Sequence, residues 1–210
     1  MAGRYWRDKW AAPLYATGAE FLFCEKAWEQ GEMVSPKDAG AYDVPTFFRH
    51  ARAILDDDTL KCRGKNSNIG YGGGSGYTTA PKTTAVNLGS GRTAKSVSLK
   101  WVHTCVILDD DTVKCWGTGS SGQLGYGNNN NLYSPPSSTV NLGMGVTSIS
   151  AGAYTSCAIL TNGGVKCWGS NGYGQIGDGT TTARNSPADV DLGTGLTAKM
   201  VYVGYYSPPL

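Results

Sequence analysis

Residues 105–117 read CVILDDDTVKCWG, and residues 157–169 repeat the phrase as CAILTNGGVKCWG. A weaker copy, RAILDDDTLKCRG, occupies residues 52–64. Successive copies begin 53 and 52 residues apart. A fixed period in the range of about 20 to 50 residues is the signature of a repeat architecture. The chain is therefore expected to build one small unit three times.

The rest of each unit also recurs. Residues 123–127 read QLGYG and residues 175–179 read QIGDG. A closing phrase appears three times, as VNLGSG at 86–91, VNLGMG at 140–145 and VDLGTG at 190–195. The period thus covers whole units and not only their cysteines.

Each unit is predicted to form short antiparallel strands. Apolar runs flank a tight corner, which is Asp109–Asp111 in one copy and Asn162–Gly164 in the next. Asn-Gly favours a two-residue hairpin connection, so the acidic corners are expected to be looser. A further strand is expected just before each hairpin, near residues 96–99 and 148–151. Three or four short strands in about 50 residues match one propeller blade.

Residues 157–177 resemble the regulator of chromosome condensation repeat family, and most closely its cysteine-bearing extracytoplasmic variant. The resemblance covers about residues 46–206. It implies a β-propeller, whose closed members usually carry seven blades. The first unit departs from the family pattern, because Arg63 replaces the tryptophan. The chain also stops at residues 205–207, where a fourth hairpin would begin.

The fold class that follows is mainly β: a partial β-propeller of about three antiparallel blades, preceded by an aromatic-rich N-terminal arm. The arm covers residues 1–45 and has one candidate short helix, about 18–30, with Phe21, Cys24 and Trp28 on one face. Residues 46–206 hold three repeats and the stub of a fourth. The repeats are placed at about 46–97, 98–149 and 150–201.

Composition narrows the function classes. Glycine contributes 30 of 210 residues, and its cost inside helices argues against a helical bundle. The net charge of +2 offers no polybasic surface for nucleic acid. No apolar run approaches the roughly 20 residues of a spanning helix, although peripheral association with a membrane complex is compatible with the sequence.

The six cysteines suggest disulfides. Cys105/Cys115 and Cys157/Cys167 would lie opposite each other across their hairpins, within bonding range. In the first unit Arg52 replaces one partner, so the remaining cysteines, Cys24 and Cys62, could form a third bridge. The alternative is six reduced cysteines that act as small hydrophobes.

Disulfides would favour an oxidising, non-cytosolic compartment: lumenal, periplasmic or extracellular. Residues 1–6, however, read MAGRYW and lack the apolar core of a secretion signal. Either a presequence has been removed or the protein is not exported, and a cytosolic location stays open.

Three blades cannot close a ring, so the flanks of the array need a cover. The arm or a partner subunit could supply it, and we favour a partner. Aromatic side chains are typical interface anchors. The predicted partner-binding residues lie in the arm and in the last segment: Tyr5, Trp6, Trp10, Tyr15, Phe21, Trp28, Tyr202, Tyr205 and Tyr206.

No residue pattern points to catalysis, a cofactor or a metal. His50 and His103 share one repeat position, which favours structural or surface residues over a catalytic pair. The acidic corners 56–58 and 109–111 could hold calcium, but the matching third corner has no acidic residue. We therefore expect a non-catalytic structural subunit that binds protein within a larger assembly. The family resemblance implies one alternative, regulation of an enzyme or GTPase by exchange or inhibition.

Overall fold

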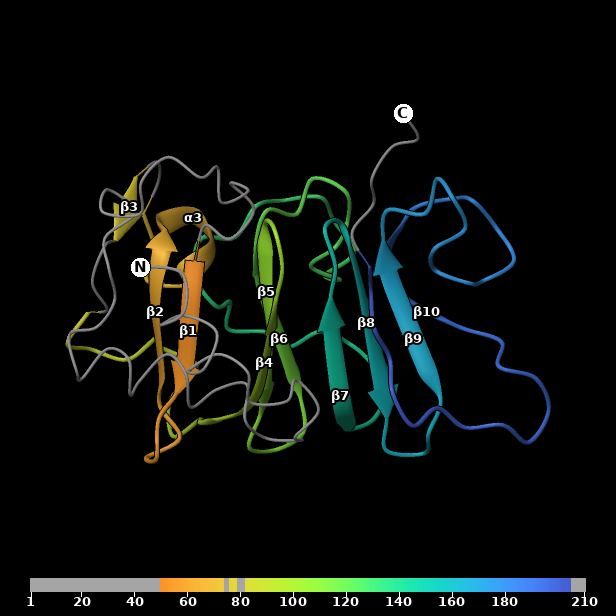
Figure 1. Ribbon diagram of the computed structural model, residues 1–210, viewed down its shortest axis with the longest axis horizontal. Coiled ribbons are helices and arrows are strands. Elements are labelled where there is room, and N and C mark those ends of the chain that lie inside the picture. Colours follow the sequence, from red (N-terminus) through yellow and green to blue (C-terminus); the bar gives the residue numbers. More distant parts are fainter. Residues whose placement is uncertain (1–49, 74–75, 79–81, 205–210) are drawn as a thin grey trace, which may run out of the picture. The chain divides into compact units, whose positions relative to one another are not determined.

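The three repeated phrases fold as antiparallel β-hairpins (Figure 1). β1 (His50–Ile54) pairs with β2 (Leu60–Lys65), β5 (His103–Leu108) with β6 (Val113–Gly117), and β8 (Thr155–Leu160) with β9 (Val165–Gly169). These bounds come from a computed structural model, which describes residues 50–73, 76–78 and 82–204. The described residues all fall within one compact unit.

Further strands extend each hairpin into a blade. The expected preceding strands are present as β4 (Ala94–Leu99) and β7 (Val146–Ala151), and β3 (Tyr77–Thr78) and β10 (Arg184–Asp189) add outer edges. The sheet orders are β1-β2-β3, β4-β5-β6 and β10-β9-β8-β7, here called blades one, two and three. The predicted mainly-β partial propeller is confirmed. The repeat bounds proposed at 97/98 and 149/150 pass through β4 and β7.

Two elements do not follow from the repeat. β10 has the polar sequence RNSPAD, and its pairing with β9 shifts register between Arg184 and Ala188. Proline is tolerated at such an edge because it has no N–H to contribute to a ladder. A single helical turn, α3 (Asn66–Ile69), follows β2. The arm helix predicted near residues 18–30 lies outside the described residues.

The hairpin corners correct one expectation. Gly163 N–H donates to Leu160 O at 2.9 Å, and the acidic corner repeats this bond from Asp111 to Leu108 O at 3.0 Å. Gly163 and Asp111 both have positive φ, whereas Asn162 does not. Every corner is therefore a turn followed by one left-handed residue, and not a two-residue Asn-Gly connection. The prediction that the acidic corners are looser was wrong, because Asp111 adopts the conformation that Gly163 adopts.

The core lies between blades. All six residues of β5 and all six of β8 are buried, because these strands have neighbours on both faces of their sheets. Blades two and three share one apolar cluster: Cys105, Ile107, Val113, Cys115, Leu124, Val140 and Leu142 with Val146, Ile149, Ala158, Leu160 and Trp168. Within the described part of the chain, no helix has the length and apolar character needed to cross a membrane.

Candidate functional site

The junction between blades two and three is centred on one backbone carbonyl. Gln123 O accepts hydrogen bonds from Ser156 Oγ and from Trp168 Nε1, each at 2.9 Å. Ser156 and Trp168 stand directly opposite each other on β8 and β9. We call such a hydroxyl and indole the donor pair, and the residues Gln123–Gly125 that receive them the acceptor loop. The contact joins consecutive blades through fully buried groups.

The junction between blades one and two repeats this arrangement. Asn68 O accepts from Thr104 Oγ1 at 2.9 Å and from Trp116 Nε1 at 3.0 Å. Thr104 and Trp116 are again cross-strand partners. The Arg52 guanidinium also donates to this carbonyl and lies over the Trp116 ring, 5.8 Å from its centroid. The acceptor loop of blade one is therefore Asn68–Gly70.

A glycine ends each acceptor loop because the indole lies against it. A Cβ on Gly125 would lie 2.8 Å from Trp168 Nε1, and a Cβ on Gly70 would lie 2.9 Å from Trp116 Nε1. Both glycines also have positive φ, +82° and +89°. Any larger residue would meet both a steric and a backbone penalty.

Blade three carries a third acceptor loop, Gln175–Gly177. Gln123 is fully buried in the filled junction, whereas Gln175 is exposed. A Cβ on Gly177 would meet only Val190 Cγ1, at 3.3 Å. Within the described ranges, no donor bonds to the Gln175 carbonyl, and no indole lies at Gly177. This loop is the candidate binding site.

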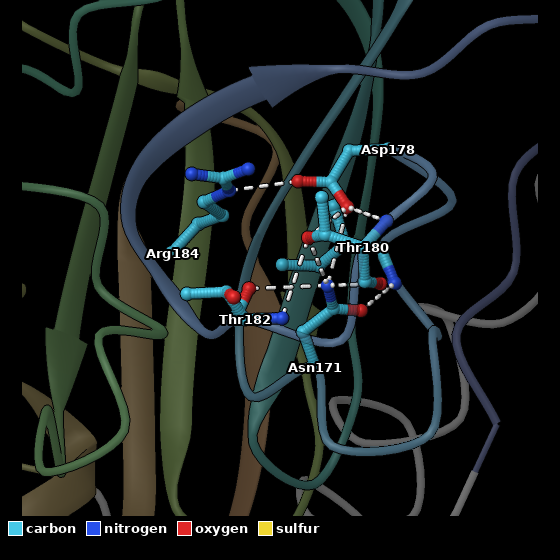
Figure 2. A network of polar contacts seen from close by, with 6 residues as sticks. Asn171, Asp178, Thr180, Thr182 and Arg184 are labelled. Carbon is cyan, nitrogen blue, oxygen red and sulfur yellow. Dashed lines mark hydrogen bonds and ion pairs between the residues drawn. The ribbon is translucent and has the colours of Figure 1, made fainter.

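A polar network holds the open acceptor loop in shape (Figure 2). The buried Asn171 side chain accepts from Ile176 N at 2.9 Å and donates to Thr180 O at 2.9 Å and Thr182 O at 3.1 Å. Asp178 accepts from Thr180 Oγ1 at 2.8 Å and forms an ion pair with Arg184 at 2.7 Å. The loop is thus fixed before any partner arrives.

The same network sets the charge of Asp178. The Thr180 hydroxyl and then the Arg184 guanidinium stabilise the carboxylate and lower its pKa to about 2. The Asp178 side chain is only 7% exposed. Asp178 therefore stays ionised, and the ion pair persists, through the whole physiological pH range.

A second feature of the open end is the segment 198–203. Val203 N donates to Ser150 Oγ at 2.9 Å, as Ala151 N on β7 donates to Ser98 Oγ on β4 at 2.9 Å. The segment therefore occupies the place of a first strand in a fourth blade. Val201 and Val203 pack against the apolar cluster of blade three. In the described chain no strand pairs with this segment.

Among the predicted partner-binding residues, Tyr202 lies in this segment and is 77% exposed. Lys100 Nζ donates to Tyr202 Oη at 3.0 Å and to Val203 O at 2.9 Å. The other predicted aromatics, at 5, 6, 10, 15, 21, 28, 205 and 206, lie outside the described residues. Their roles stay predictions.

The cysteines of blades two and three are bonded in pairs. The structure joins Cys105 to Cys115 and Cys157 to Cys167, with Cα atoms 4.1 Å apart in both pairs. Each pair occupies directly opposed positions of its hairpin. In blade one, Arg52 stands opposite the buried Cys62. Cys24 lies outside the described residues, so its pairing with Cys62 stays a prediction.

One contact has the composition of a nucleophile–base pair but not its chemistry. His103 Nε2 lies 2.8 Å from Ser156 Oγ, and both residues are fully buried. The hydroxyl proton of Ser156 is already donated to Gln123 O, so His103 must donate to the serine. Burial, with the nearby charge of Arg52, lowers the pKa of His103 to about 3. This histidine is a neutral structural group and cannot act as a base toward Ser156.

All three carboxylates in the acidic corner of blade two form ion pairs with neighbouring cations. Arg92 pairs with Asp109 at 3.1 Å and Asp110 at 2.6 Å, and Lys95 pairs with Asp111 at 2.7 Å. Across the ranges that the structure describes, no group of three His, Cys, Asp or Glu side chains could hold a metal ion. The open end of blade three therefore remains the candidate site.

Sequence profiles of the regulator of chromosome condensation (RCC1) repeat match this region. One profile matches residues 94–123 and 146–175, and a second matches 110–159. Residues 94–175 of this chain therefore match the regulator of chromosome condensation repeat. The matched segments contain both donor pairs and the acceptor loop of blade two in full, so the junction contacts belong to the RCC1 repeats.

Known proteins resemble this chain in sequence or in fold. The Ultraviolet-B receptor UVR8 from Arabidopsis thaliana is 29% identical over 158 residues, 74% of this chain and 35% of the receptor. Prp20p from Saccharomyces cerevisiae, a protein with described binding properties toward Gsp1p and histones, matches with TM-score 0.60 and 19% identity over 68% of this chain. Human WBSCR16 matches with TM-score 0.55 and 23% identity over 67% of this chain. This chain spans 36% of Prp20p and 37% of WBSCR16, so it covers about a third of each relative.

The QLG and QIG phrases are visible in the sequence as repeats, but the role of the QLG phrase in receiving the next unit is not. The spacing gives little help, because Thr104 follows Asn68 by 36 residues whereas Ser156 follows Gln123 by 33. A further repeated phrase, not part of the expectations above, is TAKMV at residues 197–201, which copies TAKSV at residues 93–97 and so corresponds to the start of β4.

Proposed function

We propose that this chain is a non-catalytic structural subunit that binds protein and docks into a larger assembly. The observation that supports the proposal is the acceptor loop Gln175–Gly177. Its two counterparts are filled by the next blade, whereas here Gln175 and Gly177 are exposed and no described donor bonds to the Gln175 carbonyl. A partner that covers the loop would bury a preformed hydrogen-bond acceptor and complete an apolar junction.

The segment 198–203 supports the same proposal. It lies in the place of a first strand and offers backbone groups that another strand can pair. Adding a strand to an exposed sheet edge is a common mode of protein recognition. Edges left uncovered would promote aggregation, which favours a chain that is normally bound to a partner.

The behaviour of the purified 22.1 kDa chain tests the proposal. We expect the isolated protein to self-associate in size-exclusion chromatography with light scattering, or to melt without cooperativity. A monodisperse 22 kDa monomer with a sharp cooperative transition would contradict dependence on an assembly. Guanine-nucleotide exchange or enzymatic turnover by the purified chain would instead favour the regulator that the RCC1 family implies.

We also propose that the protein resides in an oxidising, non-cytosolic compartment. The cross-strand pairs Cys105–Cys115 and Cys157–Cys167 support this location, because cytosolic reductants keep most thiols reduced. Mass mapping of protein isolated without reductant should find both bridges and would also test Cys24–Cys62. Free thiols at all six positions would exclude the oxidising location.

A further inference from the structure

We propose that the open end of blade three binds a β-hairpin of a different polypeptide, one in which a serine or threonine stands directly opposite a tryptophan. The inference rests on the proposed protein-binding function and names the chemistry of the partner. The partner's hydroxyl and indole both donate to the Gln175 carbonyl, and its first strand pairs with residues 198–203.

The two filled junctions define what the partner must carry. In each, one hydroxyl and one indole converge on a single carbonyl, from residues that are 12 positions apart and paired across a hairpin: Thr104 with Trp116, and Ser156 with Trp168. Two donors on one carbonyl fix the angle of the incoming hairpin as well as its distance. A lone tryptophan on an extended peptide would satisfy half of this geometry.

The receiving surface has the same parts in all three blades. Val86 and Val140 lie beside the glycines of the filled acceptor loops, where a Cβ would meet Val86 Cγ1 at 2.9 Å and Val140 Cγ1 at 3.0 Å. Val190 takes that place beside Gly177, at 3.3 Å. Among the described residues, the open loop therefore lacks the hydroxyl and the indole that complete the other two.

The described residues of a second copy of this chain do not supply the missing donors. Its first blade would be the one to dock, and there the cross-strand pair is Ala51 with Arg63. Alanine has no hydroxyl and arginine has no indole. The donor pairs of blades two and three are already engaged within their own chain. In the part of the chain that the structure describes, the array can therefore receive a blade next to blade three, but blade one offers no donor pair.

A peptide copied from the chain itself is the probe. Residues 153–171, closed by the Cys157–Cys167 disulfide, contain one complete donor pair. Isothermal titration of this peptide into the full-length protein should show binding. Trp168→Phe in the peptide keeps an aromatic ring but removes the N–H, and should weaken binding about three- to tenfold.

Two variants of the full-length protein form a matched test. Gly177→Asn places a side chain where the indole must lie, and should weaken binding by about tenfold or more. Gly179→Asn is the control, because Gly179 has a similar φ of +75° and nothing lies within 4 Å of its Cβ position. It should bind the peptide like the unmodified protein.

A fusion covers the case in which binding in trans falls below the measurable range. Residues 153–171 are placed directly after Gly204, in place of residues 205–210, which raises the effective concentration of the hairpin. The fusion should elute as a monomer and melt at a higher temperature than the same fusion with Trp168→Phe in the added hairpin.

Equal binding of the hairpin peptide by Gly177→Asn and Gly179→Asn would overturn the donor-pair site but leave the protein-binding function intact. A fusion no more stable than the starting chain, together with no binding in trans, would overturn the site outright. An isolated chain that is a monodisperse monomer and melts cooperatively would overturn the proposed function as a subunit of an assembly.

Discussion

Lowering the pH from 7 to 5 should destabilise the junction between blades two and three through His103. Its Nε2–H donates to Ser156 Oγ, and its Nδ1 is buried without a hydrogen-bond partner in the described structure. A second proton would have to enter at Nδ1, close to the charge of Arg52. Burial and this charge lower the folded-state pKa to about 3, against 6.5 for an ordinary histidine.

The sign follows from proton counting. Between pH 6.5 and 3 the unfolded chain binds a proton at His103 and the folded chain does not, so the folded state loses stability as the pH falls. Above pH 6.5 the contribution is fully present. At pH 5, 1.5 units below the unfolded value, the loss amounts to about 2 kcal/mol.

Urea unfolding at pH 7 and pH 5 measures this effect. The matched variant is His103→Thr, because Thr155 fills the same strand position in blade three. The variant loses packing at both pH values, but the difference between the two values isolates the imidazole. The unmodified protein should lose about 2 kcal/mol more than His103→Thr on acidification. Equal losses would refute the assignment of a neutral, buried imidazole.

Three further changes probe the junctions, the bridges and the loop network. Gly125→Ala should lower the free energy of unfolding by about 1 to 3 kcal/mol more than Gly177→Ala, because both glycines have positive φ but only Gly125 faces an indole. If the two variants lose equal amounts of melting temperature, the contact between Gly125 and the ring does not contribute to stability. Replacing both Cys157 and Cys167 with serine should lower the free energy of unfolding by about 2 to 3 kcal/mol, because the bridge joins residues 10 apart. The urea midpoint measures this loss, and a midpoint equal to that of the parent protein would contradict the prediction. Asp178→Asn should lose less stability than the parent protein when the pH falls from 4 to 2. The lowered pKa of Asp178, about 2, stabilises the parent protein above pH 3.8, and this contribution disappears as the pH falls toward 2. Equal decreases in melting temperature for the two proteins over that range would count against the ion pair.

The parts of the fold that repeat could be predicted from the sequence. The hairpins of 105–117 and 157–169 and the strands before them follow from apolar runs, turn residues and a fixed period. The pairing of opposite cysteine positions follows from the same register, because the period-2 alternation of a hairpin leaves few choices once the corner is placed. Patterns of this kind predict the local structure without knowledge of the neighbouring blades.

The parts that depend on neighbours could not be predicted. β10 reads as a loop because it contains Pro187 and polar residues, and only the edge of β9 makes it a strand. The acceptor role of Gln123 belongs to its backbone carbonyl, which every residue type possesses, so side-chain identity gave little indication of it. The left-handed Asp111 was also missed, because its conformation is set by the hairpin around it and not by propensity.

The geometry of the blade junctions has a consequence for how such arrays change in length. Every interior unit brings both halves of the contact: a carbonyl for its successor and a hydroxyl–indole couple for its predecessor. A gene duplication that copies one whole period would therefore create a new junction that has both the carbonyl and the hydroxyl–indole couple. Insertion or deletion of part of a period would leave one of these groups without its counterpart. Growth and loss by complete periods is the route that this architecture tolerates.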